Sequence, residues 1–412
     1  MAAPPRLDAA LASKVSFAAI VEAAARVEGR IARTPALYSR QLSQLTGAEV
    51  WIKFENLHAT GSFKERGAVN RLLQLTPEER KRGVICASAG NHAQALAHHA
   101  QQLGVPATIV MPSTTPLVKV EQTRRAGATI VLEGETFDDA VRHAQALRAA
   151  GDLVFVPAFD DPDIVIGQGT CALELLADAP DLDVVLVPIG GGGLIAGMSV
   201  AAKRIKPDVR IFGVEAAMYP SFHARCAGAP NPSGGQTIAE GIAVKTVSDL
   251  TFAIAAPLIE GVLLVQEAEI EHAVALYCSV EKTVAEGAGA ATLAALLANR
   301  ERFKGLKCGL TLSGGNIDMR LLASVLNRAL VRDGRILHLR FVGDDRPGIL
   351  ANIARVIGDS GGNIMQVQHH RTTLDAPAKG VEFEIELEAR DAAHAEQVLG
   401  ALAAAGFSPR RV

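Results

Sequence analysis

The feature that most constrains the fold is an alternation of short apolar runs with alanine-rich helical runs, which continues to about residue 325. Apolar runs at Gly83–Ala87 and Val184–Ile189 are followed by helical runs at Asn91–Leu103 and Leu194–Ile205. Strand–helix alternation predicts parallel sheets joined by right-handed crossovers. The chain is 49% hydrophobic but only 4% aromatic, so Ala, Val, Leu and Ile must build the core. A region of this length should divide into two lobes with a cleft between them.

The C-terminal segment has a different pattern. Ile336–Val342 alternates apolar and polar residues, and helical runs follow Gly348 and fill Ala392–Ala404. Val381–Ala389 alternates strictly and predicts a strand with one solvated face in an antiparallel sheet covered on one side. Its apolar positions are Val381, Phe383, Ile385 and Leu387, and its polar positions are Glu382, Glu384, Glu386 and Glu388.

We therefore predict an α/β chain of two domains. Residues 1–330 form the first, with parallel-sheet lobes and a smaller lobe at roughly 55–155 nested within it. Residues 335–412 form a small α+β domain in the order βαββαβ.

Charge and cysteine content limit the partners. The net charge of −3 gives no reason to expect binding to nucleic acid or to an anionic membrane, so small molecules or other protein chains remain. The five cysteines are scattered, which favours a reducing compartment. Val184–Ala202 carries no charge and approaches membrane-spanning length, but Pro188 and four consecutive glycines within it favour a strand, a turn and a helix. We expect a cytoplasmic protein.

The run Gly190-Gly191-Gly192-Gly193-Leu194 ends one of the apolar strands and opens a helix. Such a turn presents backbone N–H groups and the positive end of the helix dipole, which bind anions and above all phosphate. The run also fits the dinucleotide-binding pattern loosely, with Glu215 at the end of the next strand. A phosphate ligand is therefore indicated, while its identity stays open.

Lys64 lies in a second motif, Ser62-Phe63-Lys64-Glu65-Arg66-Gly67-Ala68. Thr60-Gly61-Ser62 indicates a turn and a helix cap, which would put Lys64 in the first turn of a helix. The positive end of the dipole lowers the pKa of a lysine there and favours the neutral amine that covalent chemistry requires. Alone, such a lysine is more often a solvated surface charge.

Two further glycine-bearing turns follow strands, at Ser88-Ala89-Gly90-Asn91-His92 and at Ser313-Gly314-Gly315-Asn316. Together with the other motifs they indicate sites for a carboxylate, a phosphate and a covalent amine in one cleft. The eleven histidines show no metal-ligand spacing.

In this order the four motifs resemble the threonine dehydratase (threonine ammonia-lyase) family of fold-type II pyridoxal-phosphate enzymes, over about residues 15–325. The C-terminal segment resembles an ACT domain, an amino-acid-sensing module, with Asp345-Arg346-Pro347-Gly348 and Gly362-Asn363-Ile364 in the expected places. The resemblance implies conversion of L-threonine to 2-oxobutanoate and ammonia, and of L-serine to pyruvate.

The resemblance also implies roles for individual residues. Lys64 would attach pyridoxal phosphate covalently and move the α-proton. Phe63 would pack beside the cofactor ring, Asn91 would bond its hydroxyl and Ser313 would face its nitrogen. The phosphate would bind Gly190, Gly191, Gly192, Gly193 and Leu194, and the substrate carboxylate would bind Ser88, Ala89, Gly90, Asn91 and His92.

Two positions depart from related racemases. Serine racemases carry a serine where this chain has Ala89, which argues against efficient racemisation. They also bind a divalent cation through a glutamate and an aspartate; Glu215 fits the first, but Ser221 replaces the second, so a monovalent ion is equally plausible.

The alternatives that stay open are a racemase or β-replacement enzyme, an NAD-dependent oxidoreductase and a non-catalytic amino-acid sensor. An effector bound between two ACT domains would require a homodimer or homotetramer.

Overall fold

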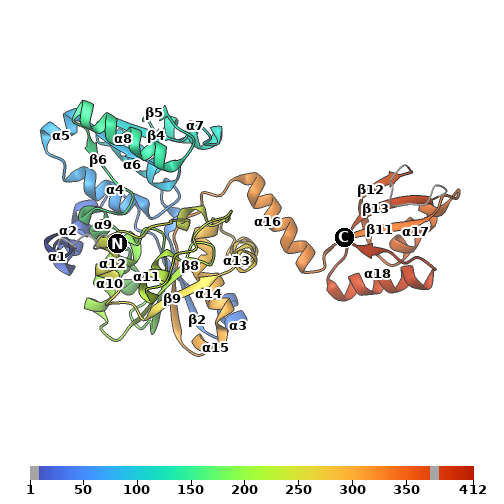
Figure 1. The fold of residues 1–412 in the computed structure, drawn as a ribbon. Helices are drawn as coiled ribbons and strands as arrows, with labels where there is room; N and C mark the ends of the chain where they lie inside the picture. The colour runs from blue at the N-terminus through green and yellow to red at the C-terminus, as the bar shows by residue number, and fades with distance from the viewer. Residues whose placement is uncertain (1–8, 372–379) are drawn as a thin grey trace. The chain divides into compact units, whose positions relative to one another are not determined.

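The computed structural model describes residues 9–371 and 380–412 of the 412-residue chain. The chain divides into two compact units, Met1–Ile317 and Asp318–Val412 (Figure 1). This division places helix α16 (Met319–Arg332) in the second unit, whereas the sequence assigned residues up to 330 to the first. The two units are described separately below.

A six-stranded sheet forms the larger lobe of the first unit, in the order β1-β2-β10-β7-β8-β9. β1 pairs antiparallel with β2, and all other neighbours are parallel. The central strand β7 is buried along its whole length, which explains why its sequence is a continuous apolar run. The strands are β1 (Ala36–Ser39), β2 (Glu49–Phe54), β7 (Val184–Pro188), β8 (Arg210–Ala216), β9 (Gly261–Val265) and β10 (Lys307–Leu312).

A four-stranded parallel sheet forms the smaller lobe, in the order β5-β4-β3-β6. Its core joins strand residues such as Ile109 to helix residues such as Leu96. The expected alternation of strands and helices is confirmed in both lobes. The strands are β3 (Val84–Ala87), β4 (Ala107–Met111), β5 (Thr129–Leu132) and β6 (Val154–Phe155).

Helices pack around both sheets of this unit (Figure 1). The helices are α1 (Ala9–Lys14), α2 (Phe17–Val27), α3 (Arg40–Thr46), α4 (Lys64–Leu73), α5 (Pro77–Arg82), α6 (Asn91–Gln102), α7 (Leu117–Arg125), α8 (Phe137–Gly151), α9 (Pro162–Asp178), α10 (Gly193–Ile205), α11 (Ser221–Ala227), α12 (Asp249–Ala255), α13 (Glu267–Ser279), α14 (Gly287–Ala298) and α15 (Arg300–Phe303). The 3₁₀ turn η1 (Glu55–Leu57) follows β2, and η2 (Glu240–Ile242) lies between α11 and α12.

The uncharged stretch Val184–Ala202 forms β7, the glycine turn and most of α10 inside the larger lobe. Its apolar side chains join the core of that lobe. Among the residues that the structure describes, none of the helices combines the length and apolar character needed to cross a bilayer.

The second unit holds α16 and a four-stranded antiparallel sheet in the order β12-β13-β11-β14. α17 and α18 lie over one face, where Phe341 and Phe383 are paired across β11 and β13 within the core. The predicted βαββαβ order is confirmed. Its elements are β11 (Ile336–Asp344), α17 (Ile349–Asp359), β12 (Asn363–His370), β13 (Gly380–Glu388), α18 (Ala392–Ala404) and β14 (Arg410–Arg411).

The glutamate face of β13 is not uniformly solvated. Glu388 is exposed, but Glu382 is only 3% exposed, so the prediction of four solvated glutamates is wrong at this position. Arg340 on the neighbouring strand lies 3.4 Å from Glu382 and 2.7 Å from Glu384. A cation that pairs with both carboxylates explains how this end of the strand tolerates burial.

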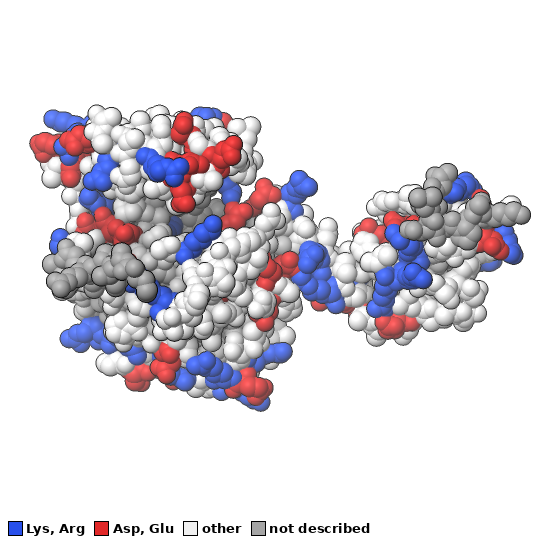
Figure 2. Space-filling view, in the orientation of Figure 1, with Lys and Arg blue, Asp and Glu red and all other residues white. Residues whose placement is uncertain are grey.

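Basic and acidic side chains are interspersed on the face shown in Figure 2. Both signs occur on each unit there, in keeping with the net charge of −3. This surface gives no support to a polyanionic partner.

We expect Gly197→Ala to destabilise the first unit, because α9 and α10 cross closely at this glycine. An added Cβ would lie 2.2 Å from the carbonyl oxygen of Val165 and 2.6 Å from the nitrogen of Gly169. Overpacking against backbone should lower the free energy of unfolding by about 3 kcal/mol, measured by urea denaturation.

Gly151→Ala is the matched control, since its Cβ would only touch Leu153 at 3.4 Å. Equal stability of the two variants would show that the helix pair separates without cost.

Candidate active site

Lys64 is the first residue of α4, and the strand end that carries Ser313 holds it there. The N–H of Phe63 donates to the carbonyl oxygen of Ser313 over 3.0 Å, and Ser62 forms a β-bridge with Gly314. Phe63, not Ser62, is the N-cap residue, and no side chain caps the helix. The expectation that Ser62 caps the helix is therefore wrong, while the placement of Lys64 in the first turn is confirmed.

The Lys64 side chain is half-buried, and its amine lies next to an aromatic ring. Nζ donates to the carbonyl oxygen of Ala158 over 2.9 Å and lies 5.1 Å from the ring centre of Phe63. Burial lowers the pKa of Lys64 to about 8, although the charge of Glu286 opposes this shift. The direction agrees with the sequence-based expectation, and loss of solvent is the largest cause of the shift.

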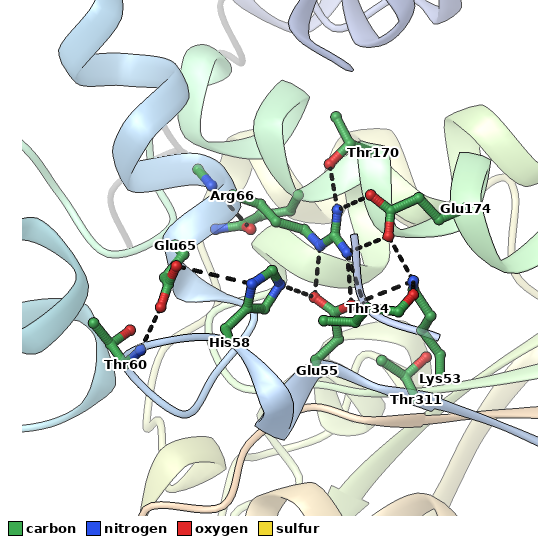
Figure 3. A network of polar contacts seen from close by, with 12 residues as sticks. Thr34, Lys53, Glu55, His58, Thr60, Glu65, Arg66, Thr170, Glu174 and Thr311 are labelled. Atoms are coloured by element: carbon green, nitrogen blue, oxygen red, sulfur yellow. Dashed lines mark hydrogen bonds and ion pairs between the residues drawn. The ribbon is translucent and has the colours of Figure 1, made fainter. Parts of the chain in front are cut away.

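A buried network of charges anchors the residue two positions after Lys64 (Figure 3). The guanidinium of Arg66 donates to both carboxyl oxygens of Glu55 over 2.6 and 2.7 Å, and to those of Glu174 over 2.8 and 2.7 Å. Lys53 also donates to Glu174, over 2.5 Å. Two bidentate pairs fix the guanidinium in one orientation, so the start of α4 is tied to the end of β2 and to α9.

Glu65, the neighbour of Lys64, is fixed in a similar way (Figure 3). Its carboxylate accepts hydrogen bonds from the N–H of Thr60 and from Nε2 of His99, the latter over 3.1 Å. Burial alone would raise the pKa of Glu65, but these hydrogen bonds lower it to about 2. An ionised Glu65 therefore holds the turn before Lys64 closed.

The glycine run follows β7 and opens α10, as predicted. Gly192 has a φ of +88°, a conformation that side chains rarely adopt. A Cβ on Gly191 would lie 2.2 Å from the ring of Phe159, and one on Gly192 would lie 2.6 Å from Oγ1 of Thr251. Glycine is thus required at the turn by its close packing against Phe159 and Thr251. In front of it, the first N–H groups of α10 have no acceptor within the helix and suit a phosphate.

A cavity of about 590 Å³ brings these motifs together within the first unit. Its volume lies in the usual range for a cofactor and a small substrate. The predicted residues that line it are Phe63, Lys64, Ser88, Gly90, Asn91, His92, Gly190, Gly191, Gly192, Gly193, Leu194 and Ser313. A lysine with a lowered pKa, a helix N-terminus suited to phosphate and a neutral hydroxyl on one cavity fit pyridoxal phosphate.

The loop at Ser88–His92 keeps only part of its backbone available for a substrate carboxylate. The N–H of Ser88 donates to Val110, and that of Gly90 donates to Oγ of Ser88. His92 contacts the carbonyl oxygen of Val156 through Nε2, and burial lowers its pKa to about 4. Donors toward a carboxylate include the first-turn N–H groups of α6.

Sequence reasoning missed Glu286 and Phe159, which also line the cavity. Burial raises the pKa of Glu286 to about 7. Its one sequence signal is its position as the acidic residue directly before α14, a helix without charged side chains. Phe159 carries no such signal, because it acts by packing against glycines far along the chain.

Glu215, the candidate cation ligand, is buried and holds the start of α11. Its carboxyl oxygens accept hydrogen bonds from the N–H groups of Phe222 over 2.8 Å and His223 over 2.9 Å. Within residues 9–371 and 380–412, no three His, Cys, Asp or Glu side chains group as they would around a metal ion. A cation at Glu215 stays a prediction.

Comparison with known proteins gives the class. The pattern of the pyridoxal-phosphate dependent enzyme family matches residues 27–314, and that of the ACT domain matches residues 338–405. An L-threonine ammonia-lyase of Thermotoga maritima is 43% identical over 395 residues, which cover 95% of this chain and 98% of that protein.

Solved structures agree with this class. Threonine deaminase isoform 2 of Solanum lycopersicum superposes with a TM-score of 0.73 at 37% identity and covers 77% of this chain and 94% of its own. Maize serine racemase superposes with a TM-score of 0.72 at 31% identity and covers 77% of this chain and 98% of its own.

The fold and the cavity thus define an enzyme with pyridoxal phosphate as its cofactor. The chain belongs to the threonine ammonia-lyase (threonine dehydratase) family, with an ACT domain in its C-terminal part. The resemblance carried by the four motifs is confirmed.

We expect Arg66→Met to destabilise the first unit strongly, because it removes the guanidinium that makes bidentate pairs with the buried carboxylate of Glu55 and with Glu174. Breaking a buried pair in this way costs about 3–5 kcal/mol, measurable as a loss in the free energy of unfolding. Arg82→Met is the control, since it removes an exposed pair with Asp152 and should cost about 0–1 kcal/mol. Similar losses in both variants would contradict the anchoring role of Arg66.

Proposed function

We propose that this enzyme removes water and then ammonia from L-threonine to give 2-oxobutanoate, and acts on L-serine to give pyruvate. The observation that carries the proposal is the Lys64 amine, whose pKa is lowered to about 8, on a cavity shared with the glycine turn. The likeness to the L-threonine ammonia-lyase of Thermotoga maritima supports the choice of substrate.

Each motif that lines the cavity has a task in this reaction. Pyridoxal phosphate, when bound, supplies an electron-withdrawing ring that makes the α-proton of an amino acid acidic. Gly190–Gly193 and Leu194 would hold the phosphate, and Asn91 the ring hydroxyl. Ser313 would face the ring nitrogen with a neutral hydroxyl, which gives a milder electron sink than a carboxylate.

The protein then moves one proton. Neutral Lys64 takes the α-proton of the substrate, whose carboxylate is held at the first turn of α6. The β-hydroxyl takes up a proton and leaves as water, and the released enamine hydrolyses to the 2-oxo acid and ammonia. Loss of one proton and one hydroxyl accounts for the water formed.

Racemisation is the second candidate, because maize serine racemase shares the fold. Ala89 occupies the position of the racemase serine, and its methyl side chain cannot carry a proton to the opposite face of the cofactor. Ala89 packs against the core of the smaller lobe. This position favours elimination over racemisation.

We further propose that the ACT domain binds an amino-acid effector between two copies of the chain, in a homodimer or homotetramer. The match at residues 338–405 supports effector binding, and the antiparallel sheet offers strand edges and a polar face for a second copy.

A cytoplasmic location agrees with the five free cysteines, of which three are buried.

The first experiment measures 2-oxo acid and ammonia from L-threonine and L-serine with the purified enzyme. We expect turnover in the wild type and loss of both turnover and visible cofactor absorption in Lys64→Ala, because the variant lacks the amine that would attach the cofactor covalently. D-amino acid formation without 2-oxo acid would instead establish the racemase. Cofactor absorption without turnover of either substrate would point to another β-substituted amino acid.

The second experiment tests regulation by removing residues 335–412. Turnover of L-threonine should survive. The superposition with maize serine racemase covers 98% of that protein but 77% of this chain, so a related enzyme is complete without the remaining part of this chain. Activation or inhibition by any of the common amino acids should disappear. Control that persists unchanged in the shortened enzyme would rule out the ACT domain as the effector site.

A further inference from the structure

Glu286 is an acidic residue of the cavity to which the sequence assigned no role. It directly precedes α14 and lies on the cavity lining together with Lys64 and Asn91. Its Oε1 accepts a hydrogen bond of 2.7 Å from Nδ2 of Asn91. The residue assigned to the ring hydroxyl of the cofactor is therefore held by a carboxyl group inside the cavity.

Asn316, the last residue of the fourth motif, holds Asn91 from the other side. Its Nδ2 donates to Oδ1 of Asn91 over 2.8 Å and to the carbonyl oxygen of Thr60 over 2.6 Å. A carbonyl oxygen can only accept, so Asn316 must turn its NH₂ group toward Thr60 and Asn91. Asn91 must then turn its own NH₂ group toward Glu286, which leaves one hydrogen for a ligand.

Two glycines make room for this chain of hydrogen bonds. A Cβ on Gly61 would lie 2.6 Å from Oδ1 of Asn316, and one on Gly314 would lie 2.5 Å from Oε1 of Glu286. Gly61 also has a φ of +73°. The glycines of two sequence motifs therefore keep the same set of polar side chains in place.

We propose that Asn316, Asn91 and Glu286 form a relay of fixed direction, in which Glu286 is a positioning residue that holds Asn91 as a donor toward the ring hydroxyl. The inference rests on the proposed function, because it takes this cavity as the place where cofactor and substrate meet. An ionised carboxylate accepts the hydrogen bond of Asn91 more strongly than a neutral carboxyl group does. The relay is therefore strongest when Glu286 is ionised.

The surroundings of Glu286 place this ionisation near neutrality. Burial raises its pKa to about 7, although the hydrogen bond from Asn91 and the charges of Lys119 and Lys64 lower it. Glu240, which pairs with Lys119 at 2.6 Å, raises it further. Other ionisable groups on the cavity lining are His92, Asp138 and Lys245. The relay weakens as pH falls through this range, since the carboxylate then gains a proton.

The test uses the holoenzyme and records its visible cofactor spectrum without substrate from about pH 6 to about pH 8.5, around the expected pKa. The wild-type spectrum should change around pH 7, and that of Glu286→Gln should not, while the variant retains cofactor. Glutamine still accepts from Asn91 but cannot ionise. At the upper end of the range kcat for L-threonine should be about tenfold lower in the variant.

Glu240→Gln is the matched control, because Glu240 faces Glu286 but lies outside the relay. Removing this negative neighbour should move the spectral change to lower pH without abolishing it. Asn316→Asp removes the donor to Asn91 and should abolish the pH-dependent change, as Glu286→Gln does.

A Glu286→Gln enzyme that keeps the wild-type spectral change would overturn the relay, whether or not L-threonine is turned over. A wild-type spectral change without turnover would leave the relay standing and refute the proposed function. If Glu286→Gln does not fold, the other two variants decide. The relay is overturned if the spectral change of Glu240→Gln occurs at the same pH as in the wild type and Asn316→Asp still shows the wild-type spectral change.

Discussion

The site depends on the ion pairs that the buried guanidinium of Arg66 makes with two glutamates. The guanidinium makes bidentate pairs with Glu55, the first residue after β2, and with Glu174 on α9. A buried charge without partners costs several kcal/mol, so the chain must bring these segments together whenever α4 is buried. Since Lys64 lies two residues before Arg66, the same contacts fix where its amine enters the cavity.

This arrangement separates two kinds of ionisable group. In the buried network at the start of α4, the side chains of Arg66, Glu55 and Glu174 are closely paired and stay ionised (Figure 3). Inside the cavity, burial moves the pKa of Lys64 down to about 8 and that of Glu286 up to about 7. Lys64 and Glu286 thus change protonation near neutrality on the cavity where proton transfer is needed, whereas the three charges that anchor α4 do not.

Much of the fold could be predicted from local patterns. Strand–helix alternation gave the parallel sheets, and the alternation at Val381–Ala389 gave the antiparallel sheet of the second unit, because side-chain periodicity reports which faces are buried. The pattern misled at Glu382, whose burial depends on Arg340 of another strand. Periodicity describes one strand and carries no information about its neighbour.

The candidate site was predictable to the same extent. Lys64, the glycine turn and Ser313 belong to compact motifs and line the cavity as expected. Phe159 and Glu286 were missed, because their roles arise from contacts with Gly191 and Asn91, which are distant in the sequence. The lowered pKa of Lys64 was predicted in direction from the helix dipole, whereas its largest cause is burial, which is a property of the assembled lobe.

The sequence by itself determined the two sheet types, the turns that meet at the cavity and the residues that carry the chemistry. These follow from backbone preferences and side-chain periodicity, which act over a few residues. Only the tertiary structure decided which groups are charged and which end of the Asn91 side-chain amide faces Glu286. It also decided why Gly191 and Gly192 of the turn are needed. Those properties depend on burial and on hydrogen bonds between distant segments, and neither exists before the chain is packed.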